Sequence, residues 1–274
     1  MSGERFNQAI GYFLVLCKAF RSDVQLWRAL KDHQGPKGRT RLMYAAKEGD
    51  VAWARFLLDR GARMEVCTQW NVDDRPSCGT ALMFASRGGH LDIARLLIER
   101  GARADAARTG DGATALMLAS FAGQQEMAQF LVEGGASVNA ATADDGTTAL
   151  MLVSERGSLG LAHFLVGGGA NVNAARKDGQ TALMCASNRG HVGTVQLLLE
   201  AGASVNAATA GGGVTALMWA SQEGQLETVQ HLVERGANVH VIMADGSGRT
   251  ALSLAMDAGH GGVAHFLQAA PNPN

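Results

Sequence analysis

Aromatic residues and prolines are scarce in this sequence. Phenylalanine, tryptophan and tyrosine make up 5% of the 274 residues, and there are four prolines against 35 glycines. A core built from this composition must rely on small and aliphatic side chains, while hydrophobic residues still make up 47% of the chain. The composition therefore suits closely stacked helices joined by glycine-rich turns.

The sequence also lacks an excess of charge and any cluster of cysteines. Its net charge is −1, which gives no case for binding to nucleic acid or to a membrane surface, where a basic face would be expected. The four cysteines form no Cys-x-x-Cys pair, which argues against a zinc site and favours a reducing compartment, the cytoplasm or the nucleus. Cys67 and Cys78 flank one insertion, so a disulfide between them is the alternative to two free thiols.

No apolar run is long enough to cross a bilayer, so no membrane insertion is expected. The most apolar segment, residues 9–17 (AIGYFLVLC), is similar to the core of a secretory signal, but Glu4 offsets Arg5 and no small-residue cleavage site follows. The alternative is a divergent helical cap over residues 1–37, which would cover the open face of whatever follows it.

One tetrapeptide, Thr-Ala-Leu-Met, occurs five times. Its threonines are Thr80, Thr114, Thr148, Thr181 and Thr215, at intervals of 34, 34, 33 and 34 residues. The related Thr-Ala-Leu-Ser begins at Thr250, and Thr-Arg-Leu-Met begins at Thr40, before an insertion. Self-similarity at this interval is typical of a stacked repeat array. The sequence thus predicts seven units.

The fourth unit illustrates the local pattern. Residues 149–156 are long enough for two helical turns, and the segment 159–166 carries apolar residues on one helical face. Gly157 and Gly169 follow these segments, and glycine accepts the left-handed conformation that ends helices. Thr148 precedes the first segment as an N-cap, since its hydroxyl can accept an unpaired backbone N–H. Each unit is therefore predicted to be helix, turn, helix, loop.

Three further motifs recur with Thr-Ala-Leu-Met. They are Gly-His (as at Gly89-His90), a Leu-Leu pair (as at Leu96-Leu97) and Gly-Ala-x-Val-Asn-Ala (as at residues 135–140). Together these motifs resemble ankyrin repeats over residues 38–268, leaving a short tail at 269–274. The resemblance implies an all-α repeat solenoid of stacked helix-turn-helix units with short hairpin loops, in which the concave side binds partners.

The chain departs from the ankyrin pattern at one recurring place. The family usually has Pro and His where this chain has Ala and Met, so a polar contact is replaced by thioether packing. The resulting row of methionines at 43, 83, 117, 151, 184 and 218 is predicted to be core. A soft-metal or promiscuous ligand surface is the alternative.

Candidate catalytic groups are few. His90, His191 and His260 recur at one turn position, so they are interpreted as turn residues. His231 replaces an apolar residue and is the one histidine considered as a catalytic group. The alternative is a partly buried histidine that only packs and makes one hydrogen bond. Glycine-rich loops such as residues 109–114 lack the Gly-Lys-Ser/Thr of a phosphate loop. No enzyme activity, cofactor, metal site or small-molecule substrate is predicted.

The predicted function is a non-catalytic scaffold or adaptor, a monomer that holds a protein or peptide segment along the groove. The alternative is a regulatory or inhibitory subunit of an enzyme. The candidate partner-binding residues lie at the ends of the first helices, at the hairpins and in the insertion: Arg39, Lys47, Glu48, Trp70, Arg87, Phe121, Glu155, Arg156, Gln180, Asn188, Arg189, Gln222, Glu223, Arg249 and Asp257. Among them Phe121 is the strongest candidate anchor, because a large apolar side chain at an otherwise polar position loses about 1.5–3 kcal/mol of burial unless a partner covers it.

The resemblance also implies a modification. Asn139, Asn173 and Asn206, each in a Val-Asn-Ala motif, are candidate sites of asparaginyl hydroxylation.

Overall fold

The computed structural model describes residues 40–65, 70–72, 75–77 and 79–270. The cap predicted over residues 1–37 therefore lies outside the described residues, as do Arg39, Cys67 and Cys78. The described part forms seven helix pairs in chain order, which are called repeats 1 to 7 below: α3 (Arg41–Glu48) and α4 (Val51–Asp59), α5 (Ala81–Gly88) and α6 (Leu91–Glu99), α7 (Ala115–Ala122) and α8 (Gln125–Glu133), α9 (Ala149–Arg156) and α10 (Leu159–Gly167), α11 (Ala182–Arg189) and α12 (Val192–Glu200), α13 (Ala216–Gln222) and α14 (Leu226–Glu234), and α15 (Ala251–Asp257) and α16 (Gly261–Ala269).

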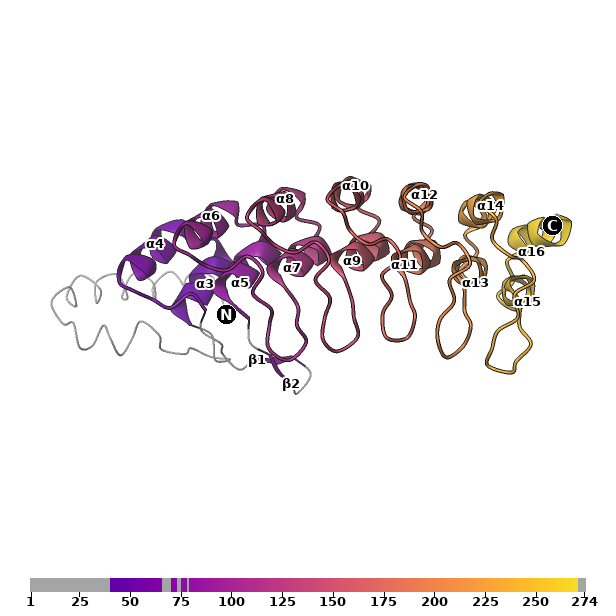
Figure 1. The fold of residues 1–274 in the computed structure, drawn as a ribbon, viewed down its shortest axis with the longest axis horizontal. Helices are drawn as coiled ribbons and strands as arrows, with labels where there is room; N and C mark the ends of the chain where they lie inside the picture. The colour runs from indigo at the N-terminus through magenta and orange to yellow at the C-terminus, as the bar shows by residue number, and fades with distance from the viewer. Residues whose placement is uncertain (1–39, 66–69, 73–74, 78, 271–274) are drawn as a thin grey trace, which may run out of the picture.

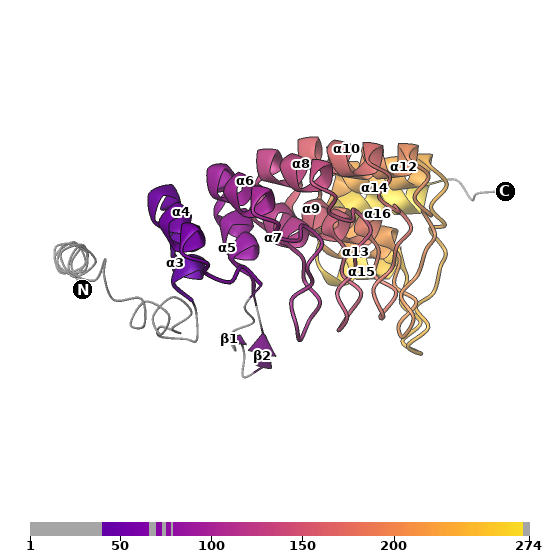
Figure 2. The ribbon, with the colours of Figure 1, turned by 60° about the vertical axis from the view of Figure 1, so that its left-hand side comes forward.

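The helices form two layers. The second helices, α4 to α16, lie in one row above the row of first helices, α3 to α15, and loops project below the first helices (Figure 1). Seen from another side, the loops again project below the helices (Figure 2). The predicted all-α solenoid is confirmed, with one local addition: the insertion after repeat 1 contains a small antiparallel hairpin of β1 (Trp70–Val72) and β2 (Arg75–Ser77).

The predicted helix caps are present. In repeats 1 to 6 the threonine hydroxyl accepts the backbone N–H of the methionine three residues later, at 3.3–3.4 Å. Each of these bonds satisfies one of the N–H groups that a first helical turn leaves unpaired. At the other end of α9, Gly157 has the left-handed φ of 72° that was expected.

The core runs between the two helix rows. The six methionines of the predicted row are 0–2% exposed and belong to one continuous apolar cluster with the leucines of both helices. The interpretation as core rather than as a ligand surface is thereby confirmed. The thioether also replaces a polar contact in one repeat, where the Thr80 N–H donates to the Met83 sulfur at 3.4 Å.

Backbone hydrogen bonds tie neighbouring loops together. The N–H of Ala143 donates to the Asp111 carbonyl at 2.7 Å, and those of Lys177, Ala210 and Ala244 donate to the preceding loop in the same way at 2.8–2.9 Å. This ladder fixes the spacing of the loops, and with it the spacing of the first helices to which they lead.

Candidate functional site

The candidate surface lies at the carboxyl ends of the first helices. The first-helix row is defined here as the residues seven and eight positions after each N-cap threonine. Its members are Lys47, Glu48, Arg87, Gly88, Phe121, Ala122, Glu155, Arg156, Asn188, Arg189, Gln222, Glu223, Asp257 and Ala258. All the charged members and Phe121 are exposed, whereas Asn188 is half-buried. The structure thus places nearly all the predicted first-helix residues on one accessible strip.

Phe121 is the large apolar side chain of this strip. It is 41% exposed, and the Arg156 guanidinium of the next repeat lies 4.2 Å from the centre of its ring. A cation over an aromatic face at an exposed site contributes about 0.5–1 kcal/mol. The predicted anchor therefore does not stand alone but forms a pair with a second predicted residue across the boundary between repeats 3 and 4.

Charged neighbours elsewhere in the row pair with one another. Arg189 reaches Glu155 of the preceding repeat at 3.4 Å, and Lys47 pairs with Glu48 within repeat 1. Such exposed pairs contribute little to stability, with a median of about 0–1 kcal/mol, so a bound partner can replace them at small cost.

Histidines close the boundaries between several repeats beside this row. The Nε2 atoms of His90, His191 and His260 lie 3.0–3.1 Å from a carbonyl oxygen in the first helix of the preceding repeat, those of Lys47, Glu155 and Gln222. The interpretation of these histidines as structural turn residues agrees with this geometry.

Ser158 occupies the histidine position at the boundary where Phe121 lies. A Cβ atom added at Gly123 would meet only the Ser158 hydroxyl, at 4.0 Å, whereas one added at Gly157 would lie 2.5 Å from the His191 ring. Among the described residues no hydrogen bond to the Phe121 carbonyl is formed. The first helices of repeats 3 and 4 are therefore joined at this end by the Phe121–Arg156 contact and not by an imidazole.

The two described loop residues among the predictions, Gln180 and Arg249, make contacts within their own loops. The Gln180 amide oxygen accepts a hydrogen bond from Arg176, and Arg249 donates to Ser247 at 3.3 Å and lies 3.8 Å from Asp245. Trp70 lies in β1, away from the first-helix row, and its side chain is outside the described part. The structure does not gather these loop residues with the first-helix row.

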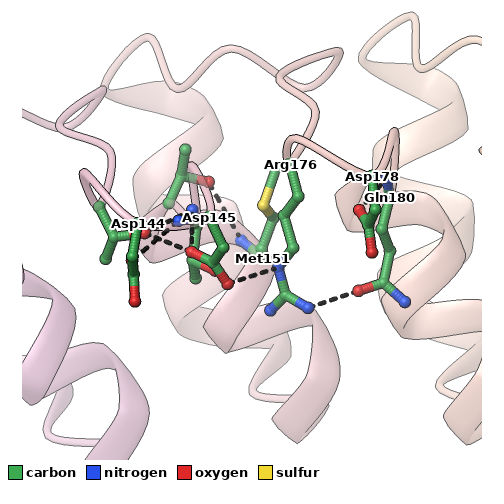
Figure 3. A network of polar contacts seen from close by, with 9 residues as sticks. Asp144, Asp145, Met151, Arg176, Asp178 and Gln180 are labelled. Atoms are coloured by element: carbon green, nitrogen blue, oxygen red, sulfur yellow. Dashed lines mark hydrogen bonds and ion pairs between the residues drawn. The ribbon is translucent and has the colours of Figure 1, made fainter. Parts of the chain in front are cut away.

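Arg176 is a residue that the sequence reasoning missed. Its side chain, 19% exposed, lies between Asp145 of the preceding loop, at 3.9 Å, and Gln180 of its own (Figure 3). Next to it, Lys177 donates to the Ala143 carbonyl at 2.8 Å. The sequence did mark this position, because Arg176-Lys177 stands where the neighbouring repeats carry Thr-Ala, at residues 142–143 and 209–210.

Asp145 organises this loop network. Its carboxylate accepts the Thr147 N–H at 2.9 Å and the Thr147 hydroxyl at 2.7 Å, and it also binds the Thr142 hydroxyl. Burial raises the pKa of the carboxyl, but these hydrogen bonds and the Arg176 charge outweigh it, so the pKa lies below its ordinary value.

An Asp145→Asn variant is expected to lose about 1 kcal/mol of unfolding free energy at neutral pH, because a charge-assisted acceptor is replaced. Since the folded-state pKa is depressed, the carboxylate stabilises the fold above its ordinary pKa of 3.8, and this contribution disappears as pH falls through the lower folded value. Urea titrations at a series of pH values should show the difference from wild type shrinking below about pH 4. An Asp257→Asn control, at an exposed position, should change the unfolding free energy at neutral pH by about 0.5 kcal/mol or less. A gap between wild type and Asp145→Asn that persists at low pH would contradict the role assigned to Asp145.

Comparison with family models decides what kind of array this is. A model of a single ankyrin repeat matches residues 37–69, and a model of three ankyrin copies matches residues 65–142, 137–209 and 208–274. The chain belongs to the ankyrin-repeat family. Among solved structures, it is similar to the human ASB11 ankyrin repeat domain, with 27% identity and a TM-score of 0.71 over 86% of this chain and 100% of that one. The comparison with curated proteins finds no match.

Ankyrin repeats are generally protein–protein interaction modules without catalytic activity. Within the described residues, no three His, Cys, Asp or Glu side chains form a group able to hold a metal ion. None of the helices in the described ranges is both long and apolar enough to cross a membrane. His231, the candidate catalytic histidine, lies in the second helix α14, half-buried between Gln196, at 2.9 Å, and Glu234, at 3.4 Å.

The Val-Asn-Ala asparagines of the ankyrin array bridge successive repeats. The Asn173 amide donates to the Gly202 carbonyl at 3.0 Å and accepts the Ser204 N–H at 2.8 Å. Asn139 and Asn206 form the equivalent pairs of bonds with the repeats that follow them. These exposed side chains thus have a structural role; their hydroxylation stays a prediction.

Proposed function

We propose that the protein is a non-catalytic scaffold or adaptor, a monomer that holds a protein or peptide segment along the first-helix row. Helix layers about 10 Å apart make the row about 60–70 Å long over seven repeats. An extended chain rises about 3.3 Å per residue, so the row has room for about 20 residues. An inhibitory subunit would be the special case in which the bound protein is an enzyme.

The observation that carries this proposal is the Phe121–Arg156 pair. Aromatic and arginine residues are the commonest energetic anchors of protein interfaces, and here they lie in contact near the middle of the row. A partner that covers Phe121 gains the apolar burial that the free protein lacks. We infer a cytoplasmic or nuclear location for such a protein from the few cysteines, which form no Cys-x-x-Cys pair. Among the described residues Cys185 is a buried free thiol, and burial raises its pKa to about 11.

An affinity capture from cytosolic extract tests the proposal. Wild type is compared with a Phe121→Ala, Arg156→Ala variant and with an Arg55→Ala, Arg95→Ala control, which removes two exposed arginines from the second helices, one of them over the Phe130 ring. We expect a protein captured by wild type and control to be lost with the Phe121 variant. With the purified partner, its affinity should fall about ten-fold or more, as for an interface hot spot.

Circular dichroism must show the same helix content in all three chains. A partner that all three capture equally would contradict binding on the first-helix row.

A further inference from the structure

The first-helix row carries an asymmetric charge pattern around Phe121. In repeats 2 to 5 it presents three arginines, Arg87, Arg156 and Arg189, against one carboxylate, Glu155, which Arg189 already contacts. In repeats 6 and 7 the row holds Glu223 and Asp257 and no cation. The two arginines without a carboxylate therefore lie one repeat before and one repeat after Phe121.

The hydrogen-bond donors of these two arginines are unused. The Arg156 guanidinium lies over the Phe121 ring, 4.2 Å from its centre, but within the described ranges neither the Arg156 side chain nor the Arg87 side chain donates a hydrogen bond. A guanidinium presents several N–H groups in a fixed plane that fits a carboxylate bidentately. Both side chains are exposed, so each is ready to bind an anionic group of a partner.

A third unused group lies at the same place. With Ser158 in the position of a histidine, the Phe121 carbonyl receives no imidazole, whereas those of Lys47, Glu155 and Gln222 do. Gln124 and Gln225 hold the same position at two other boundaries, where the side chain is longer than that of Ser158. A backbone N–H of an extended peptide is the natural donor for such an oxygen. The Phe121 ring, the two arginines and the Phe121 carbonyl together form a surface that suits a peptide.

From this charge pattern we propose that the surface formed by Arg87, Phe121 and Arg156 binds an extended acidic segment of a protein partner. One carboxylate pairs with Arg156, an apolar side chain covers the Phe121 ring, and a second carboxylate pairs with Arg87. Since repeats are about 10 Å apart and an extended chain rises about 3.3 Å per residue, the Arg87 carboxylate lies about three residues from the apolar side chain. This inference rests on the proposed function and specifies the chemistry of the partner.

A polyanion such as a nucleic acid fits the surface less well. Arg87 and Arg156 are two repeats apart, about 20 Å, so they cannot converge on one phosphate. Glu155, Glu223 and Asp257 interrupt the row and would repel a continuous line of phosphates. A segment with two acidic residues and a neutral or basic continuation toward repeats 6 and 7 meets only Glu155 as a like charge, and Arg189 already pairs with that carboxylate.

A phage-displayed library of random peptides, about twelve residues long to span four repeats, is selected on the full chain. The synthesised, fluorescein-labelled consensus peptide is then titrated by anisotropy against three chains. They are wild type, an Arg87→Gln, Arg156→Gln variant, and an Arg55→Gln, Arg95→Gln control of equal charge. We expect an apolar residue flanked by Asp or Glu about three residues away, binding about ten-fold or more weaker in the first variant and unchanged in the control.

Salt provides a second readout, since about 300 mM NaCl should weaken binding of this peptide relative to about 50 mM. Peptides without acidic residues whose binding is lost with Phe121→Ala would overturn the inference while leaving the scaffold function standing. Peptides that bind all these chains equally, or failure to select any peptide, would overturn both.

Discussion

A Met151→Ala variant is expected to lose about 2–5 kcal/mol of unfolding free energy. Met151 is fully buried in the fourth of seven repeats, so removing its side chain leaves a cavity where neighbours from adjacent first helices meet. The N-cap bond from the Met151 backbone N–H to the Thr148 hydroxyl is kept in the variant. The loss would therefore report packing alone, read from urea unfolding followed by circular dichroism.

Met256 supplies the matched control. It is 58% exposed on α15, so Met256→Ala should change the unfolding free energy by about 0.5 kcal/mol or less. If the two variants were equally stable, the methionine row would not be the structural replacement for the usual polar residues of the family. If the urea unfolding transition broadened for Met151→Ala alone, the two halves of the array would be unfolding independently in that variant. This is possible because each repeat contacts only its neighbours.

The sequence was sufficient to predict the repeat frame, because caps and apolar spacing are local. The helix predicted over residues 149–156 is α9, and the one predicted over residues 159–166 extends by a single residue as α10. Threonine at the N-cap and a left-handed glycine at the C-cap specify the ends of α9 irrespective of tertiary context. Helix α10 follows Ser158, which makes no side-chain cap bond, and ends before Gly168, whose φ is −80°.

The contacts between side chains of different repeats could not be read from the sequence. Phe121 and Arg156 were both predicted as partner-binding residues, but their contact with each other was not predicted, because the ends of α7 and α9 are adjacent only after stacking. Gln180 was predicted as free to bind a partner, but Arg176 occupies its amide oxygen. The Phe121–Arg156 distance depends on the twist between repeats. The Arg176–Gln180 contact depends on the conformation of the loop that both residues share, and neither is set by helix caps or apolar spacing.

The boundary between repeats 4 and 5 gives the second large effect. Gly157 has a φ of 72°, and a Cβ added there would lie 2.5 Å from the His191 ring. Gly157→Ala therefore imposes the left-handed penalty of about 1–2 kcal/mol and also pushes the imidazole away from the Glu155 carbonyl. Losing that hydrogen bond costs about 0.5–1.5 kcal/mol more, so a total loss of about 1.5–3.5 kcal/mol is expected.

Gly169 separates the two causes. Its φ of 84° is equally left-handed, but no atom lies within 4 Å of an added Cβ, so Gly169→Ala should cost only the conformational penalty of about 1–2 kcal/mol. Adding His191→Ala should then destabilise the wild-type background but have little effect in the Gly157→Ala background, a coupling of about 1 kcal/mol in unfolding free energy. Equal costs for the two alanine variants, or an identical His191→Ala effect in both backgrounds, would mean that the imidazole does not join repeats 4 and 5. In that case the absence of a histidine between repeats 3 and 4 would no longer help to explain why a peptide binds at Phe121.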